Sequence, residues 1–269
     1  MEILIVKDRA ELAQTAAGII RQQVESVPGS VLGLATGSTP EDTYALLVKA
    51  HKEDGLDFSQ VTTFNLDEYL GLPREHDQSY HYFMHDRLFN HINVRPENVN
   101  LPDGMASDPE EACREYEDKI DAAGGIDLQL LGIGGDGHIA FNEPGSSLSS
   151  RTRVKTLTEQ TIQDNARLFF GGDETLVPRF ALTMGVGTIL DAERILLLAS
   201  GERKAEIVRA FIEGPVSSAV TASALQMHPK VTVVLDEAAA GSLEHGEYYR
   251  WVQGQKGEYK KLLDRLAGE

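Results

Sequence analysis

Three side chains suited to proton transfer stand within eight residues of one another: Asp136, His138 and Glu143. They follow the apolar run from Leu128 to Ile133, which predicts a buried strand, and the glycines among them predict a flexible turn. A carboxylate close to a histidine fixes the tautomer of the imidazole and raises its pKa, so that the ring can shuttle protons at neutral pH. The cluster therefore predicts an acid–base site at the end of this strand.

A second acidic group, Asp67 with Glu68, comes just after the apolar run from Val61 to Phe64. Partial burial at the carboxyl end of a strand raises the pKa of a carboxyl group towards neutrality, which suits a general base. Adjacent acids also occur at solvated strand ends and helix starts. The pair therefore indicates chemistry only together with the histidine cluster.

The apolar run 31–35 leads through small residues into a predicted helix. Thr39 is expected as its N-cap, Pro40 as its first residue and Asp42 as the capping acid. Free backbone N–H groups at that terminus, with the hydroxyls of Ser38 and Thr39, would hold a phosphate or a carboxylate. An ordinary capped turn has the same appearance. The segment lacks the lysine of a P-loop, so it does not indicate nucleotide hydrolysis.

These residues need a scaffold, and the apolar pattern predicts one. Buried strands are expected at 3–6, 31–35, 61–64, 128–133, 195–199 and 231–235. Amphipathic stretches long enough to cross between parallel strands lie at 9–24, 40–53, 80–92, 109–123 and 204–213. The alternation predicts an α/β fold, a three-layer, doubly wound, mostly parallel (Rossmann-like) sheet in one domain over 1–269. Ligands of such sheets bind beyond the carboxyl ends of the strands.

Two segments stand apart from this alternation. Residues 146–180 contain Gly171, Gly172 and scattered charges, which predict loops and short helices that could form a mobile lid. Residues 245–269 are polar and contain tyrosines, and they predict a helical extension added to the sheet.

The composition excludes several classes of partner. The chain has 25 basic and 42 acidic residues, and its net charge of -17 would repel nucleic acid and anionic membranes. With Cys113 alone, no disulfide can form within the chain, which favours a reducing, cytoplasmic location. The first residues lack the pattern of a signal peptide, and no apolar run reaches the length of a membrane span. An anionic small molecule would need basic side chains gathered at one site.

Two patterns suggest a cofactor and are rejected. The run that begins at Gly132 contains Gly-x-Gly-x-x-Gly, but Pro144 stops the helix that a dinucleotide site requires, and Leu157 stands where its acid is expected. His81 and His85 have the spacing of some zinc ligands, but they share a helix with an apolar stripe and have no recognisable third ligand. We therefore expect no organic cofactor and no metal.

The run Gly-Ile-Gly-Gly-Asp-Gly-His-Ile-Ala-Phe-Asn-Glu-Pro at 132–144 resembles the signature of glucosamine-6-phosphate deaminases. Phe-Asn-Leu-Asp-Glu-Tyr at 64–69 and Ala-Thr-Gly-Ser-Thr-Pro at 35–40 are similar to that family's other two blocks. Further similarity lies at 147–153, at 181–190 and at His228-Pro229. The related 6-phosphogluconolactonases share the Gly-x-Asp-Gly-His turn, but they typically continue towards Ser-Leu-Phe-Pro, whereas this chain retains a third acid.

The resemblance implies an enzyme of amino-sugar catabolism that converts glucosamine 6-phosphate and water to fructose 6-phosphate and ammonia, without a metal or an organic cofactor. It assigns Asp67 as the base that moves a proton between C2 and C1 of the opened sugar. It assigns His138 to proton transfer at the ring oxygen, with Asp136 and Glu143 tuning the imidazole. The resemblance also implies a phosphate site made by Gly37, Ser38, Thr39, Arg167 and Lys204.

Other functions on this fold remain to be distinguished. A lactonase or another isomerase would release no ammonia from glucosamine 6-phosphate. A non-catalytic sugar-phosphate sensor in a transcription regulator would need a DNA-binding segment, yet the chain starts directly with a strand, and it retains all four acid–base residues.

The family also includes regulated enzymes. Some members are hexamers that N-acetylglucosamine 6-phosphate activates, and Ser146, Arg153 and Lys155 lie where those members bind the activator. Others are unregulated monomers. The stretch from Tyr248 to Trp251 departs from the pattern of regulated members, so a homo-oligomer and its activation both stay open.

Overall fold

The apolar runs form one parallel sheet in the computed structural model, which describes residues 1–267. Its strands lie in the order β1-β10-β9-β6-β2-β3-β5, and each neighbouring pair is parallel. Their bounds are β1 (Glu2–Val6), β2 (Val31–Leu34), β3 (Thr62–Asn65), β5 (Val99–Asn100), β6 (Leu128–Leu131), β9 (Ile195–Ala199) and β10 (Val231–Asp236). The predicted doubly wound α/β fold is confirmed.

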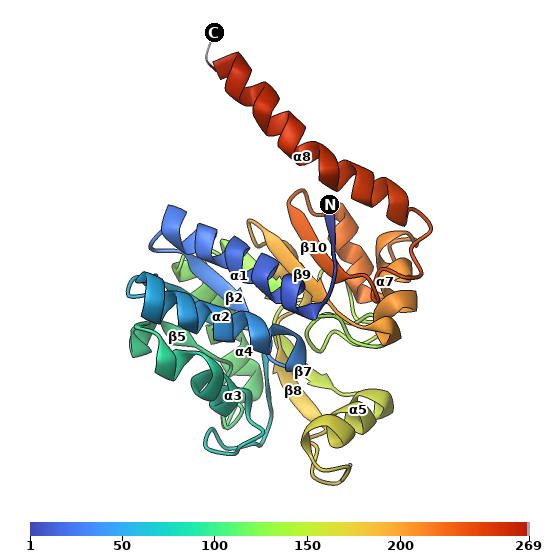
Figure 1. Cartoon of the computed structure of the whole chain (residues 1–269). Helices are drawn as coiled ribbons and strands as arrows, with labels where there is room; N and C mark the ends of the chain where they lie inside the picture. Colours follow the sequence, from blue (N-terminus) through green and yellow to red (C-terminus); the bar gives the residue numbers. More distant parts are fainter. Residues whose placement is uncertain (268–269) are drawn as a thin grey trace.

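Helices cover both faces of this sheet. The α-helices of the described residues are α1 (Arg9–Ser26), α2 (Ser38–Asp54), α3 (Tyr80–Arg87), α4 (Pro109–Ala122), α5 (Glu159–Phe169), α6 (Val186–Leu190), α7 (Ala205–Ile212) and α8 (Gly246–Ala267). Short 3₁₀ turns lie at Phe89–His91, Pro96–Asn98, Glu202–Lys204 and Thr221–Met227. Crossovers from β1, β2 and β3 run in one direction along the sheet and those from β5, β6 and β9 in the other. Right-handed crossovers therefore place α1, α2 and α3 on one face and α4 and α7 on the opposite face; Figure 1 shows α1 and α2 side by side in front of the sheet.

The start of α2 differs from the sequence prediction. The helix begins at Ser38, and Gly37 takes the N-cap position with φ of 102°, a left-handed conformation that glycine adopts without steric cost. Thr39 and Pro40 therefore lie inside the first turn instead of at the cap and the first position. Asp42 does not cap the helix but forms an ion pair with Arg9.

A second, antiparallel sheet was not predicted. It has the order β4-β8-β7 and consists of β4 (Asp67–Tyr69), β8 (Phe180–Thr183) and β7 (Arg153–Thr156). It packs with α5 on its own small apolar core, which includes Tyr69, Phe141 and Phe170. The segment 146–180 thus contains a strand as well as the expected short helix, and its mobility stays a prediction.

The predicted C-terminal extension is α8, although residues 268 and 269 lie outside the described residues. Figure 1 shows α8 running away from the sheet towards the C-terminus. In its first half it contacts β1, because Gln253 Oε1 accepts a hydrogen bond from the backbone N–H of Ile5 at 3.0 Å and Lys256 forms an ion pair with Glu2. Within residues 1–267, no helix has the length and apolar character needed to span a membrane.

Candidate active site

A cavity of about 810 Å³ opens at the carboxyl ends of β2 and β6, where the direction of the crossovers reverses. Ligands of doubly wound sheets bind at such a reversal, because the loops on its two sides diverge and leave a crevice. Residues after β3 and β9 complete the walls. The predicted site residues that line the cavity are Gly37, Ser38, Thr39, Asp67, His138, Arg167 and Lys204.

Asp67 is the first residue of β4 and only 6% exposed. Burial raises the pKa of its carboxyl group to about 8, the neighbouring charge of Glu68 adds to the rise, and His138 opposes it. A carboxylate with a pKa near the working pH is a more effective base than an ordinary, weakly basic one. Asp67 therefore has both the position and the basicity for removing a proton from carbon.

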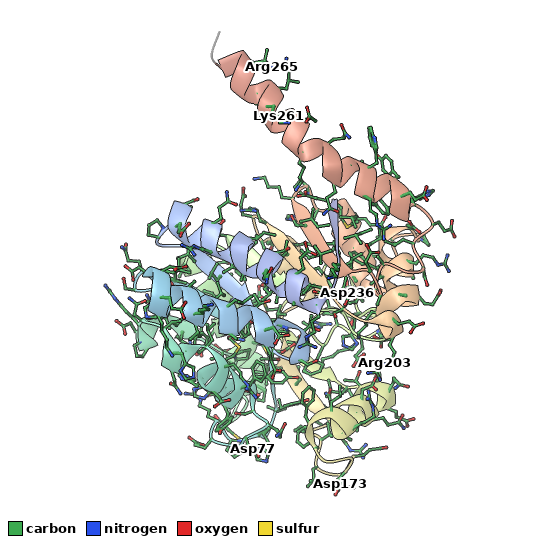
Figure 2. All side chains as sticks on the ribbon, viewed as in Figure 1. Asp77, Asp173, Arg203, Asp236, Lys261 and Arg265 are labelled. Atoms are coloured by element: carbon green, nitrogen blue, oxygen red, sulfur yellow. The ribbon has the colours of Figure 1, made fainter. Side chains whose placement is uncertain are left out.

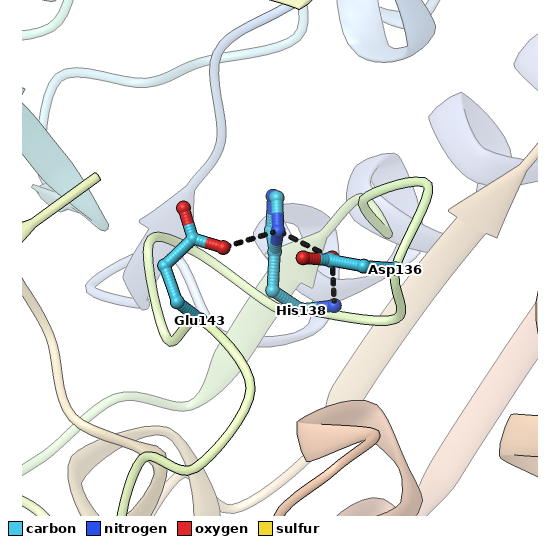
Figure 3. Close-up of side chains that lie close together, drawn as sticks. All are labelled: Asp136, His138 and Glu143. Carbon is cyan, nitrogen blue, oxygen red and sulfur yellow. Dashed lines mark hydrogen bonds and ion pairs between the residues drawn. The ribbon is translucent and has the colours of Figure 1, made fainter. Parts of the chain in front are cut away.

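His138 lies between two carboxylates (Figure 3). Its Nδ1 is 2.7 Å from Asp136 Oδ1 and 3.3 Å from Glu143 Oε2, and its backbone N–H donates to Asp136 at 3.1 Å. Burial alone would lower the pKa of His138, but the two carboxylates outweigh it and raise the pKa to about 9. The imidazole is thus held protonated at neutral pH. Nδ1 is occupied by the carboxylates, which leaves Nε2 for a substrate.

Asp136, His138 and Glu143 form a triad, and Glu143 connects this triad to α5. Its Oε1 accepts hydrogen bonds from Thr161 Oγ1 at 2.6 Å and from the backbone N–H of Thr158 at 3.3 Å. Since Thr158 is the N-cap of α5, the position of Glu143 follows the position of that helix. The loop itself turns at Gly137, whose φ of 89° suits glycine and whose missing side chain leaves room for Val220.

The other end of the cavity is suited to an anion. The first backbone N–H groups of α2, at Ser38 and Thr39, have no partner within the helix and lie at its positive end. Lys204 Nζ donates to the carbonyl oxygen of Ile133 at 2.8 Å, and burial lowers the pKa of its ammonium group. Arg167 is more exposed and forms an ion pair with Asp164 at 3.0 Å.

Sequence reasoning missed two further basic residues of the cavity wall, Arg9 and Arg203. Arg9 begins α1, and its guanidinium donates to Asp42 and to the carbonyl oxygen of Ser38, so it braces the anion-binding turn. Arg203 lies in the turn before α7 (Figure 2). Arg9 follows the carboxyl end of β1, and Arg203 follows that of β9. Since ligands of parallel sheets bind beyond these ends, the position of both residues in the sequence was a signal for them.

The three predicted activator residues do not line this cavity. Ser146 is buried, and its hydroxyl donates to the carbonyl oxygen of Glu143 at 2.7 Å. Arg153 donates to Asn142 Oδ1 at 2.8 Å, and Lys155 stands two residues further along β7. The first two therefore contact the segment that carries the triad.

Asp136, His138 and Glu143 have ligand atoms within 4.8 Å of one another, so the group could also hold a metal ion. Within residues 1–267, these three residues are the one group of three His, Cys, Asp or Glu side chains that are close enough together to bind a metal ion. His81 and His85 approach each other with ring centroids 4.4 Å apart, but they are not part of a three-ligand group. The same contacts are also expected without a metal ion, when a protonated imidazole forms ion pairs with two carboxylates.

Comparisons with known proteins place the chain in a family. The family model described as "Glucosamine-6-phosphate isomerases/6-phosphogluconolactonase" matches residues 7–234. A glucosamine-6-phosphate deaminase of Shewanella woodyi is 53% identical over 267 residues, which are 99% of each chain. One of Cellvibrio japonicus is 52% identical over 267 residues, 99% of this chain and 100% of the relative.

Solved structures include a monomeric glucosamine-6-phosphate deaminase with a TM-score of 0.88 and 50% identity, which covers 90% of this chain and 100% of its own. A 6-phosphogluconolactonase from Trypanosoma cruzi has a TM-score of 0.71 at 23% identity and covers 90% and 97% of the two chains. At that identity the likeness extends to the fold alone.

Proposed function

The chain belongs to the family of glucosamine-6-phosphate isomerases and 6-phosphogluconolactonases, and we propose that within it the protein deaminates glucosamine 6-phosphate to fructose 6-phosphate and ammonia. The observation that carries the proposal is one cavity lined by a basic carboxylate, an imidazolium and the start of α2. A sugar with a phosphate at one end and an amine near the other matches these three features.

The reaction begins with ring opening. The protonated Nε2 of His138 donates a proton to the ring oxygen, and the imidazole then takes up the proton of the C1 hydroxyl, which gives the open aldehyde and restores the imidazolium. Asp136 and Glu143 stabilise the imidazolium form that makes this donation. Opening of the ring makes the hydrogen on C2 acidic, because the adjacent aldehyde can delocalise the resulting charge.

Asp67 then moves that hydrogen. Its carboxylate removes the proton from C2 to give an enolamine, and the carboxylic acid returns the proton to C1, which leaves an imine at C2. Water adds to C2, ammonia leaves, and fructose 6-phosphate remains. One water is consumed and one ammonia released, without any change in overall oxidation state.

The phosphate group of the substrate is expected at the anion-binding end. We assign it to the backbone N–H groups of the turn at Gly37, Ser38 and Thr39, with charge from Lys204 and Arg167. Binding at a group remote from the reaction orients C1 and C2 towards Asp67 and His138. A substrate without phosphate should therefore lose turnover rate as well as affinity.

A second ligand site is part of the proposal. We place N-acetylglucosamine 6-phosphate at Ser146, Arg153 and Lys155. The contacts of Ser146 with Glu143 and of Arg153 with Asn142 offer a physical route to His138. The rate curve for the substrate should then be sigmoidal and become hyperbolic when this ligand is added. A hyperbolic curve that does not change with the ligand would exclude the site, and would fit a monomer better than a homo-oligomer.

The single, buried cysteine fits a cytoplasmic location.

The test of function is a coupled assay that measures ammonia and fructose 6-phosphate formed from glucosamine 6-phosphate. Both products should appear in equal amounts. A parallel reaction with 6-phosphogluconolactone tests the alternative activity of the family, and hydrolysis of the lactone without release of ammonia would overturn the proposal. Asp173→Asn, which changes an exposed carboxylate in a loop outside the cavity, is the matched control.

A further inference from the structure

Glu68 is a buried acid for which the mechanism above has no use. The residue is 3% exposed, and it follows Asp67 directly in β4. Oε1 accepts hydrogen bonds from the backbone N–H groups of Tyr69 at 2.9 Å and Tyr80 at 3.0 Å. Oε2 accepts one from the N–H of His81 at 2.8 Å. Hydrogen bonds from these three N–H groups to an ionised carboxylate are stronger than bonds between neutral groups.

The donors lie at the two ends of one loop. Tyr69 ends β4, and Tyr80 and His81 are the first two residues of α3, just after its N-cap Ser79. The carboxylate therefore closes the loop 70–79 into a ring and also occupies the positive end of α3. Residues of this loop and of the start of α3 line the cavity: Asp77, Gln78, Ser79 and Tyr80.

The surroundings leave the carboxylate little freedom. The backbone of Gly104 packs against it, and a side chain at that position would come within 3.1 Å of Glu68 Cγ and 2.2 Å of the carbonyl oxygen of Tyr69. The N–H of Gly71 also donates to Gly104 at 2.7 Å. The strand end, the loop and the helix start are thus packed around one side chain.

We propose that Glu68 is a positioning residue, whose carboxylate fastens the loop 70–79 to the strand of Asp67 and so holds the cavity wall at Gln78 and Tyr80 in place beside the base. The inference rests on the proposed function for its catalytic consequence. Its structural part, the fastening of the loop, can be measured without any substrate.

Glu68 also bears on the ionisation of Asp67, since its negative charge disfavours a second charge beside it. The other titratable groups that face Asp67 or Glu68 are His138, Tyr69, Tyr80, Tyr116 and Arg74. Removing the charge of Glu68 should therefore lower the pKa of Asp67. In a plot of kcat/KM against pH, the acid limb, which reports the ionisation of Asp67, would then move to lower pH. A side chain with a purely structural role would not produce this change.

The variant Glu68→Gln tests both parts. The amide keeps one accepting oxygen, but its NH₂ group faces the N–H of His81 and cannot accept from it. Hydrogen–deuterium exchange of residues 70–81 should become faster, and kcat/KM should fall about tenfold, the factor expected for one lost charge-assisted hydrogen bond. The acid limb should move to lower pH. Glu110→Gln is the matched control, because Glu110 is exposed in the first turn of α4 and lies outside the cavity.

Unchanged exchange in folded Glu68→Gln would overturn the fastening role, and an unmoved acid limb would overturn the electrostatic one. Glu68→Asp is the second variant, in case the amide does not fold. It keeps the charge but is too short for all three contacts, so it should exchange faster while the acid limb stays in place. If the wild type releases no ammonia, the proposed function fails, while the exchange experiment still decides the role of Glu68.

Discussion

Replacing Asp136 by Asn removes the carboxylate nearest to His138 Nδ1 and should change the pH dependence of the reaction. The two carboxylates raise the pKa of His138 from 6.5 to about 9, against the effect of burial. One pKa unit corresponds to about 1.4 kcal/mol, so the carboxylates and the opposing burial together favour the protonated ring by roughly 3 kcal/mol. Asp136 is the closer of the two, at 2.7 Å compared with 3.3 Å for Glu143. Its loss should lower the pKa of His138 by about one unit or more.

The consequence follows from the two roles in the reaction. With the proposed roles, the enzyme should be active when Asp67 is ionised, above its pKa of about 8, and when His138 is protonated, below its pKa of about 9. In Asp136→Asn the base limb of kcat/KM should move to lower pH. The acid limb should move, if anything, to higher pH, because a less protonated His138 lowers the pKa of Asp67 less. The window between the limbs then closes, so the maximal rate also falls.

The assay is the formation of fructose 6-phosphate from glucosamine 6-phosphate between about pH 6 and 10. Asp173→Asn serves as the control, since Asp173 lies in the loop after α5 (Figure 2) and does not line the cavity. A base limb at the same pH in Asp136→Asn and in the wild type would refute the assignment of that limb to His138.

The triad also links stability to pH. The raised pKa of His138 means that its contribution is fully present below pH 6.5 and lost as the pH rises through about 9. The pKa of Asp136 falls from 3.8 to about 2, because its contacts with His138 outweigh the opposing effect of burial. Its contribution is present above pH 3.8 and lost as the pH falls through about 2. The free energy of unfolding should therefore be lower in Asp136→Asn than in the wild type at neutral pH. The difference between the two proteins should be smaller at pH 10, where His138 is mostly neutral.

Three further predictions address the other parts of the site. Asp67→Asn keeps the shape of the base but cannot accept the C2 proton, so kcat should fall by about 10²–10⁴ while inorganic phosphate still binds; retained turnover would exclude Asp67 as the base. Lys204→Met removes a half-buried charge at the anion end and should raise KM for glucosamine 6-phosphate more than it lowers kcat; an unchanged KM would remove Lys204 from the phosphate site. Prolonged treatment with a chelator, followed by desalting, should leave the rate unchanged, whereas a loss that Zn²⁺ or Mg²⁺ restores would show that the triad binds a metal.

Six of the seven strands of the main sheet could be predicted because they read as short apolar runs, as Ile195 to Ala199 does. The seventh, β5, was missed, because its two residues are only partly buried and one of them is Asn100. The small sheet gave no such signal. Its strands are three or four residues long, and they contain the charged pair Asp67-Glu68, the basic residues of Arg153–Thr156 and the exposed Phe180. Their pairing depends on contacts between segments far apart in the chain, which local periodicity does not record.

The site was predictable where chemistry and local spacing coincide. Asp136, His138 and Glu143 are near one another in the sequence as well as in space. That Asp67 shares a cavity with His138 follows only from the strand order, because β2 lies between β3 and β6. The role of Gly37 at the start of α2 was missed, since a glycine before Ser-Thr-Pro gives no sign of its backbone conformation.

The contact of α8 with β1 has a consequence for the behaviour of the protein in concentrated solution. A parallel sheet exposes unpaired amides and carbonyls along its two outer strands, and such borders can recruit strands from other molecules. Here one border, β5, is only two residues long. At the other, the Gln253 side chain occupies an amide that an intruding strand would need. A chain that ends at residue 245 lacks α8 and this hydrogen bond. It should therefore form intermolecular β-structure at lower protein concentrations than the full chain.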